Sequence, residues 1–583
     1  MSVDVKQIGR LIRKRPLQVN WKLGVLWAAP LAFLILFYFY PLSRILTVSY
    51  QRAEAGWLAS LLEVVSSPVQ WRIIWFTVWQ ATLSTLLTLI IGLPGAYIFG
   101  RYEFPGKSLI QAMMGIPFVM PALVVAAAFN ALLGPRGWVN MALMEWFNLD
   151  HVPIQFTNTL IAILVAHIFY NLTIVIRMVG DFWSHVDPRL NHAAKVLGAN
   201  QWQTLRKVTL PLLLPAIAAA ALLIFIFDFT SFGIILVLGG PRFATLETEI
   251  YYQTVSLFNL PLAASLAVIQ LAFTLFLTIF YTRLTSRLSQ PMTLRPRQYT
   301  QRRLVHWRSR LLAGVVLGFL VAMETIPLIA LAARSFTRLE LERGAAYPIS
   351  QKFTLAFYRE LGINRRESLF YVPPTKAIVN SMAYAAATVT LALCLGLPVA
   401  WALAREPTAW TSRLMDPILM LPLGTSAVTL GLGFIVALNK PPLDLRASPI
   451  LIPLAHTLVA FPFVVRSLTP AMRSIRPRLR HAAAILGAPT SQIIRFIELP
   501  LVARALLVAA AFAFTISLGE FGATALLSRP EYPTIPVMIY RLISQPGALN
   551  YGQALALSTI LMVTCAAGIL AIERFRIADV GEF

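Results

Sequence analysis

The chain contains the stretch His192-Ala-Ala-Lys-Val-Leu-Gly198-Ala, which recurs with an offset of 289 residues as His481-Ala-Ala-Ala-Ile-Leu-Gly487-Ala. Each copy is followed at the same distance by a Leu-Pro pair, Leu210-Pro211 in the first and Leu499-Pro500 in the second. Self-similarity at a fixed offset indicates an internal duplication. Two copies of one fold, each about half of the chain, are therefore expected.

The duplication extends beyond this motif. The offset of 289 also carries His167 onto His456 and Phe232-Gly233 onto Phe521-Gly522. Further upstream the offset becomes 304, where Gly92-Leu-Pro meets Gly396-Leu-Pro. The repeat therefore covers most of each half.

Apolar residues dominate the composition. Of the 583 residues, 58% are hydrophobic and only 13% are charged, too few to cover a water-soluble protein of this length. The apolar residues form runs long enough for helices that cross a bilayer. We expect twelve such runs, near residues 23–48, 73–99, 109–133, 158–180, 212–238, 260–282, 311–333, 377–404, 414–438, 449–470, 501–527 and 552–573. The predicted fold class is an all-α membrane protein.

The distribution of arginine predicts the orientation. Segments 282–310 and 466–495 contain eight and six Arg, respectively, and no acidic residue. The positive-inside rule places both segments, and with them both termini, in the cytoplasm. Six spans per copy make the copies parallel repeats related by an axis along the membrane normal. We expect the repeats at 1–285 and 311–583, joined by a basic cytoplasmic linker at 286–310.

The net charge of +24 does not indicate nucleic-acid binding, because the basic residues lie in short segments between apolar runs, next to lipid headgroups. Cys394 and Cys565 lie inside apolar runs and predict neither a disulfide nor a metal site. Gly106-Lys107-Ser108 resembles the end of a Walker A loop, but the glycine that this motif needs at position 101 is Arg. No catalytic, metal, cofactor or nucleotide site is expected, so a separate protein must supply the energy.

Each copy of the motif follows the fourth apolar run of its half, on the predicted cytoplasmic side. Pro188 and Pro477 stand where a helix would begin. Gly198 and Gly487 stand where it would end, because glycine accepts the left-handed conformation of a helix C-terminus. A rigid helix–glycine–helix elbow at this face could dock on another protein and move the attached spans.

This motif resembles the EAA loop of ABC importer permeases, whose pattern is E-A-A-x-x-x-G followed by hydrophobic-x-Leu-Pro. The resemblance implies a MetI-like fold in the inner membrane, a pair of ATPase subunits docked on the loops and an extracytoplasmic substrate-binding protein. It assigns ATPase coupling to His192, Ala193, Ala194, Gly198, Leu210, Pro211, His481, Ala482, Ala483, Gly487, Leu499 and Pro500. The leading Glu of the family pattern is His in both copies, which puts any salt bridge of that Glu in doubt.

Two further segments resemble a narrower group within these permeases. The segments 238–250 and 517–523 look like those of ferric-iron and thiamine importer permeases, in which both halves are fused into one chain. These motifs do not separate iron from thiamine. The alternative is a secondary transporter of twelve spans, but that class predicts inverted repeats nested in each half and gives the paired elbow no role.

Two carboxylates stand in apolar runs beside the Phe-Gly pairs. Asp228 aligns with Ser517, and Glu520 aligns with Ser231. Residues three apart share a helix face, so each run is expected to offer one carboxylate and one hydroxyl on a common face. These faces could line a translocation path for a cation, or the carboxylates could be buried for helix packing. Both interpretations are open.

Three further ionisable residues lie in apolar runs. His167 and His456 occupy equivalent places, and a helix-packing hydrogen bond near the pseudo-two-fold axis is favoured over a metal site built across it. Glu324 has no acidic counterpart and is left without an assigned role.

Overall fold

The computed structural model describes residues 21–51, 57–288, 300–341, 348–364, 371–405, 410–439 and 444–575. Both termini and residues 289–299 of the predicted linker therefore lie outside the described residues. In the first half the helical elements are α2 (Trp21–Leu34), η1 (Ile35–Phe39), α3 (Tyr40–Gln51), α4 (Trp57–Ser66), α5 (Pro68–Arg101), α6 (Lys107–Val119), α7 (Ala122–Leu133), α8 (Trp138–Phe147), α9 (Leu160–Ile174), η2 (Val175–Val179), α10 (Gly180–His185), α11 (Pro188–Val196), α12 (Gln201–Thr204), η3 (Leu205–Thr209), α13 (Leu210–Phe229), η4 (Ile235–Gly239), η5 (Pro241–Phe243), α14 (Leu246–Val255) and α15 (Leu260–Leu288).

The second half repeats this order. Its helical elements are α17 (Trp307–Ser335), α18 (Ala356–Glu360), α19 (Pro374–Arg405), α20 (Trp410–Met420), η6 (Leu421–Gly424), α21 (Ala427–Ala437), α22 (Leu451–Arg473), α23 (Pro477–Ile485), α24 (Thr490–Ile493), η7 (Ile494–Glu498), α25 (Leu499–Gly519), α26 (Gly522–Leu527), α27 (Ile535–Ser544) and α28 (Ala548–Phe575). Two small sheets complete the described fold: β1 (Tyr102–Glu103) pairs with β2 (Arg302–Arg303) in parallel, and β3 (Thr337–Leu341) pairs with β4 (Pro348–Phe353) antiparallel.

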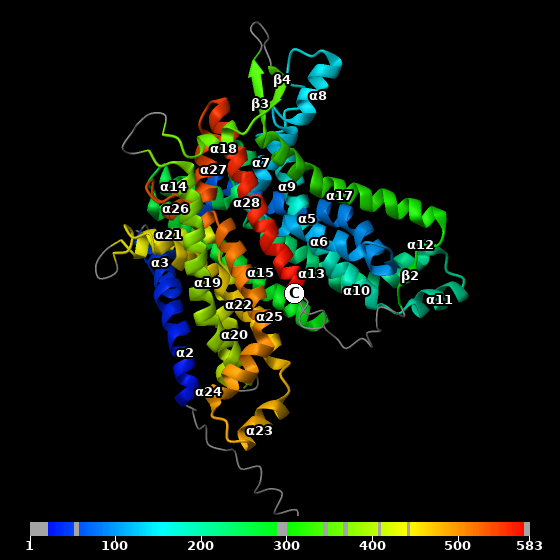
Figure 1. The fold of residues 1–583 in the computed structure, drawn as a ribbon, viewed down its shortest axis with the longest axis vertical. Coiled ribbons are helices and arrows are strands. Elements are labelled where there is room, and N and C mark those ends of the chain that lie inside the picture. Colours follow the sequence, from blue (N-terminus) through cyan, green and yellow to red (C-terminus); the bar gives the residue numbers. More distant parts are fainter. Residues whose placement is uncertain are drawn as a thin grey trace, which may run out of the picture.

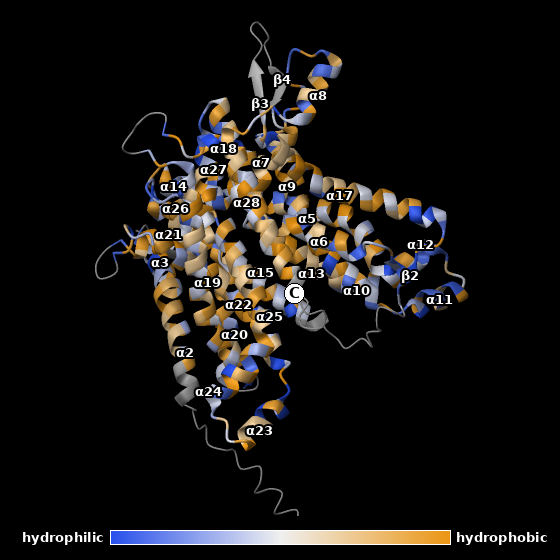
Figure 2. Cartoon of the chain, in the orientation of Figure 1, coloured by the Kyte–Doolittle hydropathy of each residue, from blue (hydrophilic) through white to orange (hydrophobic). Residues whose placement is uncertain are grey.

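Within the described residues, 11 helices are long and apolar enough to cross a membrane, or up to 12 if one bent pair counts as a span. Hydrophobic residues cover these helices, and hydrophilic residues gather at α8 and around β2 and α11 (Figure 2). This confirms the predicted class of an all-α membrane protein. In Figure 1, α8, β3 and β4 project at one end of the molecule, and α11 and α23 lie away from it.

The third run of each half, predicted as one span whose prolines suggest kinks, is broken into two helices. Residues 109–133 are divided between α6 and α7, with extended backbone at Met120 (ψ 140°) and Pro121 (ψ 140°). A residue before proline disfavours the helical conformation, which explains the break. In the second half the helices before and after the break, Trp410–Gly424 and Ala427–Ala437, meet at 95°. The Ser426 side chain accepts hydrogen bonds from the first amides of α21, as an N-cap does.

The fifth run of each half also ends earlier than predicted. Residues 212–238 and 501–527 were expected to be single spans, but α13 ends at Phe229 and α25 ends at Gly519. Glu520 has extended backbone (ψ 124°), and its carboxylate accepts the amides of Ala523 and Thr524 at the start of α26. A helix begins anew at this point, so the apolar run continues although the first helix has stopped.

The first span of each half packs against the other half. Leu34 and Tyr38 of the first span share a core with Leu403 and Phe461 of the second half, and the Tyr38 hydroxyl lies 2.7 Å from Oγ1 of Thr425. In the reverse direction, α17 packs against the first half through a core that contains Leu317, Leu320, Ile98 and Phe99. The predicted repeats are therefore interlocked: each half covers its core with a helix from its partner.

The second and fourth spans of each half approach closely at an equivalent glycine. A Cβ at Gly92 would lie 2.8 Å from Cβ of Val175, and a Cβ at Gly396 would lie 2.6 Å from Cγ1 of Val464. The two contacts are equivalent under the repeat. Small residues allow membrane helices to pack at short distance, where dispersion replaces the missing hydrophobic effect.

This contact predicts a size dependence. Gly396→Ala should destabilise the protein by about 1–3 kcal/mol, because its new methyl group overlaps Val464. Adding Val464→Ala removes the obstructing methyl groups and should restore most of the loss. Thermal unfolding in detergent measures both effects. Gly314→Ala is the control, because a Cβ there meets no atom within 4 Å; equal melting temperatures for Gly396→Ala and Gly314→Ala would contradict the packing.

Candidate functional site

Both copies of the repeated motif form the same elbow. Helix α11 begins at Pro188 and α23 at Pro477, where the prolines predicted it. Gly198 and Gly487 follow with φ of 87° and 85°. The amide of each glycine and the next amide bond back to the last turn of the helix, the Schellman pattern of a glycine-terminated helix.

The tip of each elbow exposes two large apolar side chains. Val196 and Leu197 are both 87% exposed, and their counterparts Ile485 and Leu486 are 85% and 86% exposed. The Leu-Pro pairs at 210–211 and 499–500 are also on the surface. Equivalent apolar tips that the described part of the chain leaves exposed are suited to insertion into two copies of one partner protein.

The second elbow is anchored by an ion network. Glu498, 1% exposed, lies directly before Leu499-Pro500 at the start of α25. Its Oε1 is 2.8 Å from Nη2 of Arg405 and 2.6 Å from Nε of Arg480 in α23, and its Oε2 accepts Nε1–H of Trp401 at 2.8 Å. The guanidinium of Arg405 also stacks over the Trp401 ring. The network fixes α23 to the spans behind it.

The first elbow is anchored differently. Thr209 takes the place of Glu498 and Asn191 that of Arg480, and a 3.1 Å hydrogen bond from Oγ1 of Thr209 to Oδ1 of Asn191 joins them. Nη2 of Arg302, inside the predicted linker, lies 2.7 Å from Nε2 of His192. The sequence analysis missed the Glu498 network, although an acidic residue before Leu-Pro in one copy only was a visible signal.

The predicted path residues form one polar cluster in each half. In the first, His167 bridges the pair: its Nδ1 is 3.5 Å from Oδ1 of Asp228, and its Nε2 is 2.9 Å from Oγ of Ser231. In the second, His456 does the same, with Nδ1 2.8 Å from Oγ of Ser517 and Nε2 3.3 Å from Glu520 Oε2. Both histidines therefore make the hydrogen bonds between helices that the repeat predicted.

The expectation that each carboxylate and hydroxyl share a helix face is wrong, because Ser231 lies beyond the end of α13 and Glu520 beyond the end of α25. The histidines, not a common helix face, bring them together. The two carboxylates also differ. Both oxygens of Glu520 accept hydrogen bonds at the start of α26, whereas Oδ2 of buried Asp228 has no hydrogen-bond partner among the residues that the structure describes.

The two clusters end at the pseudo-two-fold axis. Phe232 and Phe521, equivalent residues of the two halves, stack with ring centroids 5.4 Å apart. Nearby, the buried Glu247 of α14 crosses to the other half and accepts the hydroxyl of Ser426 at 2.7 Å and an amide N–H of Gln270. The sequence analysis did not single out Glu247, although it lies in the quoted segment 238–250.

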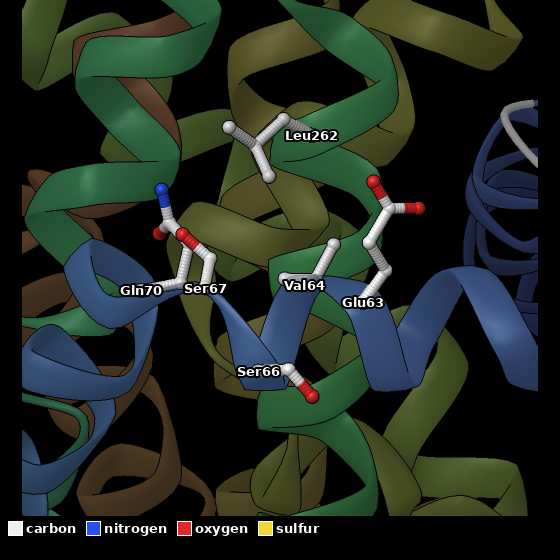
Figure 3. A pocket seen from close by; sticks show the side chains of 6 residues that line it. All are labelled: Glu63, Val64, Ser66, Ser67, Gln70 and Leu262. Carbon is white, nitrogen blue, oxygen red and sulfur yellow. The ribbon is translucent and has the colours of Figure 1, made fainter.

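A surface hollow outside these clusters holds none of the predicted site residues. A hollow of about 420 Å³ lies beside α4, α5 and α15 (Figure 3), lined by Glu63, Val64, Ser66, Ser67, Gln70 and Leu262. Among the described residues, no three His, Cys, Asp or Glu side chains are grouped as a metal site would need.

The comparison with known protein families shows which family of membrane proteins the chain belongs to. The family described as "Binding-protein-dependent transport system inner membrane component" matches residues 84–290 and 392–578, which together exceed half of the chain. The chain belongs to this family. The match occurs once in each half, as the duplicated elbow requires, and it identifies the protein as a permease component of the inner membrane with two fused halves.

Individual relatives cover nearly the whole chain. The thiamine transport system permease protein ThiP of Brucella abortus (strain 2308) is 28% identical over 516 residues, 86% of this chain and 87% of the relative. The protein of the same name from Escherichia coli (strain K12) is 26% identical over 579 residues, 96% of this chain and 98% of the relative. A solved bacterial alginate ABC transporter covers 47% of this chain with 20% identity and a TM-score of 0.39.

The asymmetric anchoring of the two elbows generates a prediction. Glu498→Gln should loosen α23, because hydrogen bonds to a buried charged group contribute about 1.5–3 kcal/mol, and the amide removes the charge that Arg405 and Arg480 share and keeps one acceptor oxygen instead of two. Amide hydrogen exchange should therefore rise across residues 477–487 and stay unchanged across 188–198. Thr209→Val is the matched control and should affect only the first elbow. Unchanged exchange of α23 in Glu498→Gln would contradict the anchoring role.

Proposed function

We propose that the chain is the fused permease of an ABC importer that carries a small organic cation of the thiamine class. The observation that carries this proposal is the pair of equivalent elbows with exposed apolar tips, in a chain that belongs to a binding-protein-dependent transport family. The substrate class is supported by thiamine permeases that align over 86–96% of the chain. A ferric ion is a less favoured cargo, because the relatives compared above are thiamine permeases.

The proposed partners contact separate parts of the molecule. Two subunits of a separate ATPase would bind the elbows, one subunit on each. Each subunit would receive the exposed apolar tip of its elbow and contact the six coupling residues predicted from the sequence in that copy. An extracytoplasmic binding protein would deliver the cargo at the end where α8, β3 and β4 project (Figure 1). The chain itself would catalyse no reaction and need no cofactor.

Reconstitution tests the function directly. Vesicles that contain the chain, its ATPase and its binding protein should accumulate radiolabelled thiamine only when ATP is enclosed with the ATPase. Uptake that persists without ATPase, driven by an ion gradient, would favour a secondary transporter. Uptake of ferric ion but not thiamine would overturn the substrate class and leave the importer class intact.

The elbow role predicts the effect of glycine replacement. The double variant Gly198→Val and Gly487→Val forces a β-branched residue into positive φ, at a cost of about 1–3 kcal/mol each. The cost is backbone strain alone, because a Cβ at either position meets no atom within 4 Å. We expect loss of ATPase association with normal membrane insertion. Gly106→Val is the control, since Gly106 also has positive φ (80°) and open surroundings but lies outside the elbows. Normal substrate-stimulated ATP hydrolysis in the double variant would rule out docking at the elbows.

Both termini and the linker at 286–310 are proposed to be cytoplasmic, with two halves at 1–285 and 311–583. In a chain with Cys394 and Cys565 replaced by Ala, Arg303→Cys should resist a membrane-impermeant thiol reagent added to intact cells. Asp150→Cys, beyond α8, should react readily, and both positions are exposed. Rapid labelling at position 303 and protection at 150 would invert the proposed orientation.

The polar clusters are proposed to border the path, with unequal roles for the two carboxylates. Asp228→Asn should slow thiamine uptake at unchanged melting temperature, because it keeps the Oδ1 acceptor of Asn171 and replaces Oδ2, which has no hydrogen-bond partner in the described part of the chain. Glu520→Gln should instead lower the melting temperature, because an amide has one acceptor oxygen for the start of α26. Uptake assays and thermal unfolding separate these effects. Full uptake by the double neutral variant would leave both carboxylates only a packing role.

A further inference from the structure

Four aromatic rings form a continuous row between the two halves. Phe232 stacks on Phe521 at 5.4 Å with an interplanar angle of 23°. On one side the Tyr251 ring of α14 lies 5.3 Å from Phe232, and on the other the Tyr540 ring of α27 lies 5.7 Å from Phe521. We call these four rings the aromatic row.

The aromatic row lies on the pseudo-two-fold axis. Phe521 is the counterpart of Phe232, and Tyr540 is the counterpart of Tyr251, both at the offset of 289. A residue can touch its own symmetry mate only if both lie beside the axis that relates them. A path between two parallel repeats follows the same axis. Cargo that passes between the halves must therefore pass these rings.

The backbone around the rings is built for close contact. A Cβ at Gly233 would lie 2.8 Å from Cβ of Ala122 in α7 and 3.3 Å from Cδ1 of Phe521. A Cβ at Gly522 would lie 3.0 Å from Cβ of Ala427, the first residue of α21. Each Phe-Gly pair is thus held against the second piece of a broken third span. Phe232 and Phe521 are only 6% and 4% exposed, so the row is closed in this conformation.

A carboxylate precedes each phenylalanine of the row in the sequence. Glu520 directly precedes Phe521, and Asp228 is four residues before Phe232. Arg541 of α27 acts on Tyr251 electrostatically, but it also interacts with Glu531. Two buried carboxylates and four ring faces make an approach route that attracts a positive charge more than a negative one.

We propose that the aromatic row is both the closed gate of the path and a binding site for a planar organic cation. When the halves separate, the faces of Phe232 and Phe521 become free, and a heteroaromatic cation can take the place that each ring occupies against the other. Ring stacking and cation–π attraction replace the Phe–Phe contact as the gate opens. The ligand class in this proposal rests on the proposed function, whereas the gate does not.

Three variants test the row. Phe232→Leu with Phe521→Leu keeps apolar bulk and removes both ring faces. Phe232→Tyr with Phe521→Tyr keeps the faces and should rescue the function. Phe229→Leu is the matched control, because it breaks an off-axis stack of similar geometry, with Phe273 at 4.6 Å.

Two readouts keep the gate and the ligand class distinguishable. Vesicles that contain the chain alone should release enclosed thiamine faster with the double Leu variant than with the wild type or Phe229→Leu. In the complete transporter at limiting thiamine, the double Leu variant should lower ATP-driven uptake about fivefold to thirtyfold, the loss of roughly one to two cation–π contacts.

The proposal is overturned if the double Leu variant matches Phe229→Leu in both leak and uptake. It is also overturned if Tyr251→Phe with Tyr540→Phe abolishes uptake while the double Leu variant retains it, because hydroxyl ligation rather than ring faces would then select the cargo. Increased leak together with reduced uptake, rescued by the double Tyr variant, supports it. Failure of the wild-type transporter to take up thiamine would instead refute the proposed function, since the leak assay needs neither partner.

Discussion

The stacking of Phe232 on its own counterpart Phe521 is the contact on which the rest of the structure depends, because it fixes the pseudo-two-fold axis. In lipid the two halves gain little from the hydrophobic effect, and their association relies on close packing and hydrogen bonds. The first span of each half packs on the other half and adds to this packing and hydrogen bonding. For example, the Tyr38 hydroxyl is hydrogen-bonded to Thr425 of the other half. Each half therefore depends on the other for a complete core.

The axis explains why the helices stop where they do. Spans that continued through Phe229 and Gly519 would carry the Phe-Gly pairs past the centre, whereas the observed breaks turn them toward each other. The broken third spans supply the surfaces at Ala122 and Ala427 against which the glycines lie. Irregular backbone inside a membrane is tolerated only where protein or an aqueous path surrounds it. These breaks therefore mark the functional centre.

The features that could be predicted from the sequence are those that residues close together in the chain determine. Hydropathy gave the span count, and proline and glycine gave the elbow from Pro188 to Gly198, because these residues restrict the backbone wherever they occur. Sequence reasoning did not predict the ends of α13 and α25, since an apolar run looks the same whether or not the helix inside it is continuous. The histidine bridges and the Glu498 network join residues far apart in sequence, so no local pattern could place them together.

The central claim is that the docked ATPase moves the two elbows relative to each other. This movement separates the halves and opens the path along the pseudo-two-fold axis. Spin labels at Arg189→Cys and Arg478→Cys, equivalent exposed positions at the start of α11 and α23 in a chain without its native cysteines, report the separation of the elbows. In the complete transporter the account predicts different distance distributions in the nucleotide-free and ATP-bound states. A single unchanged distribution in both states, in a complex that still takes up substrate, would contradict it.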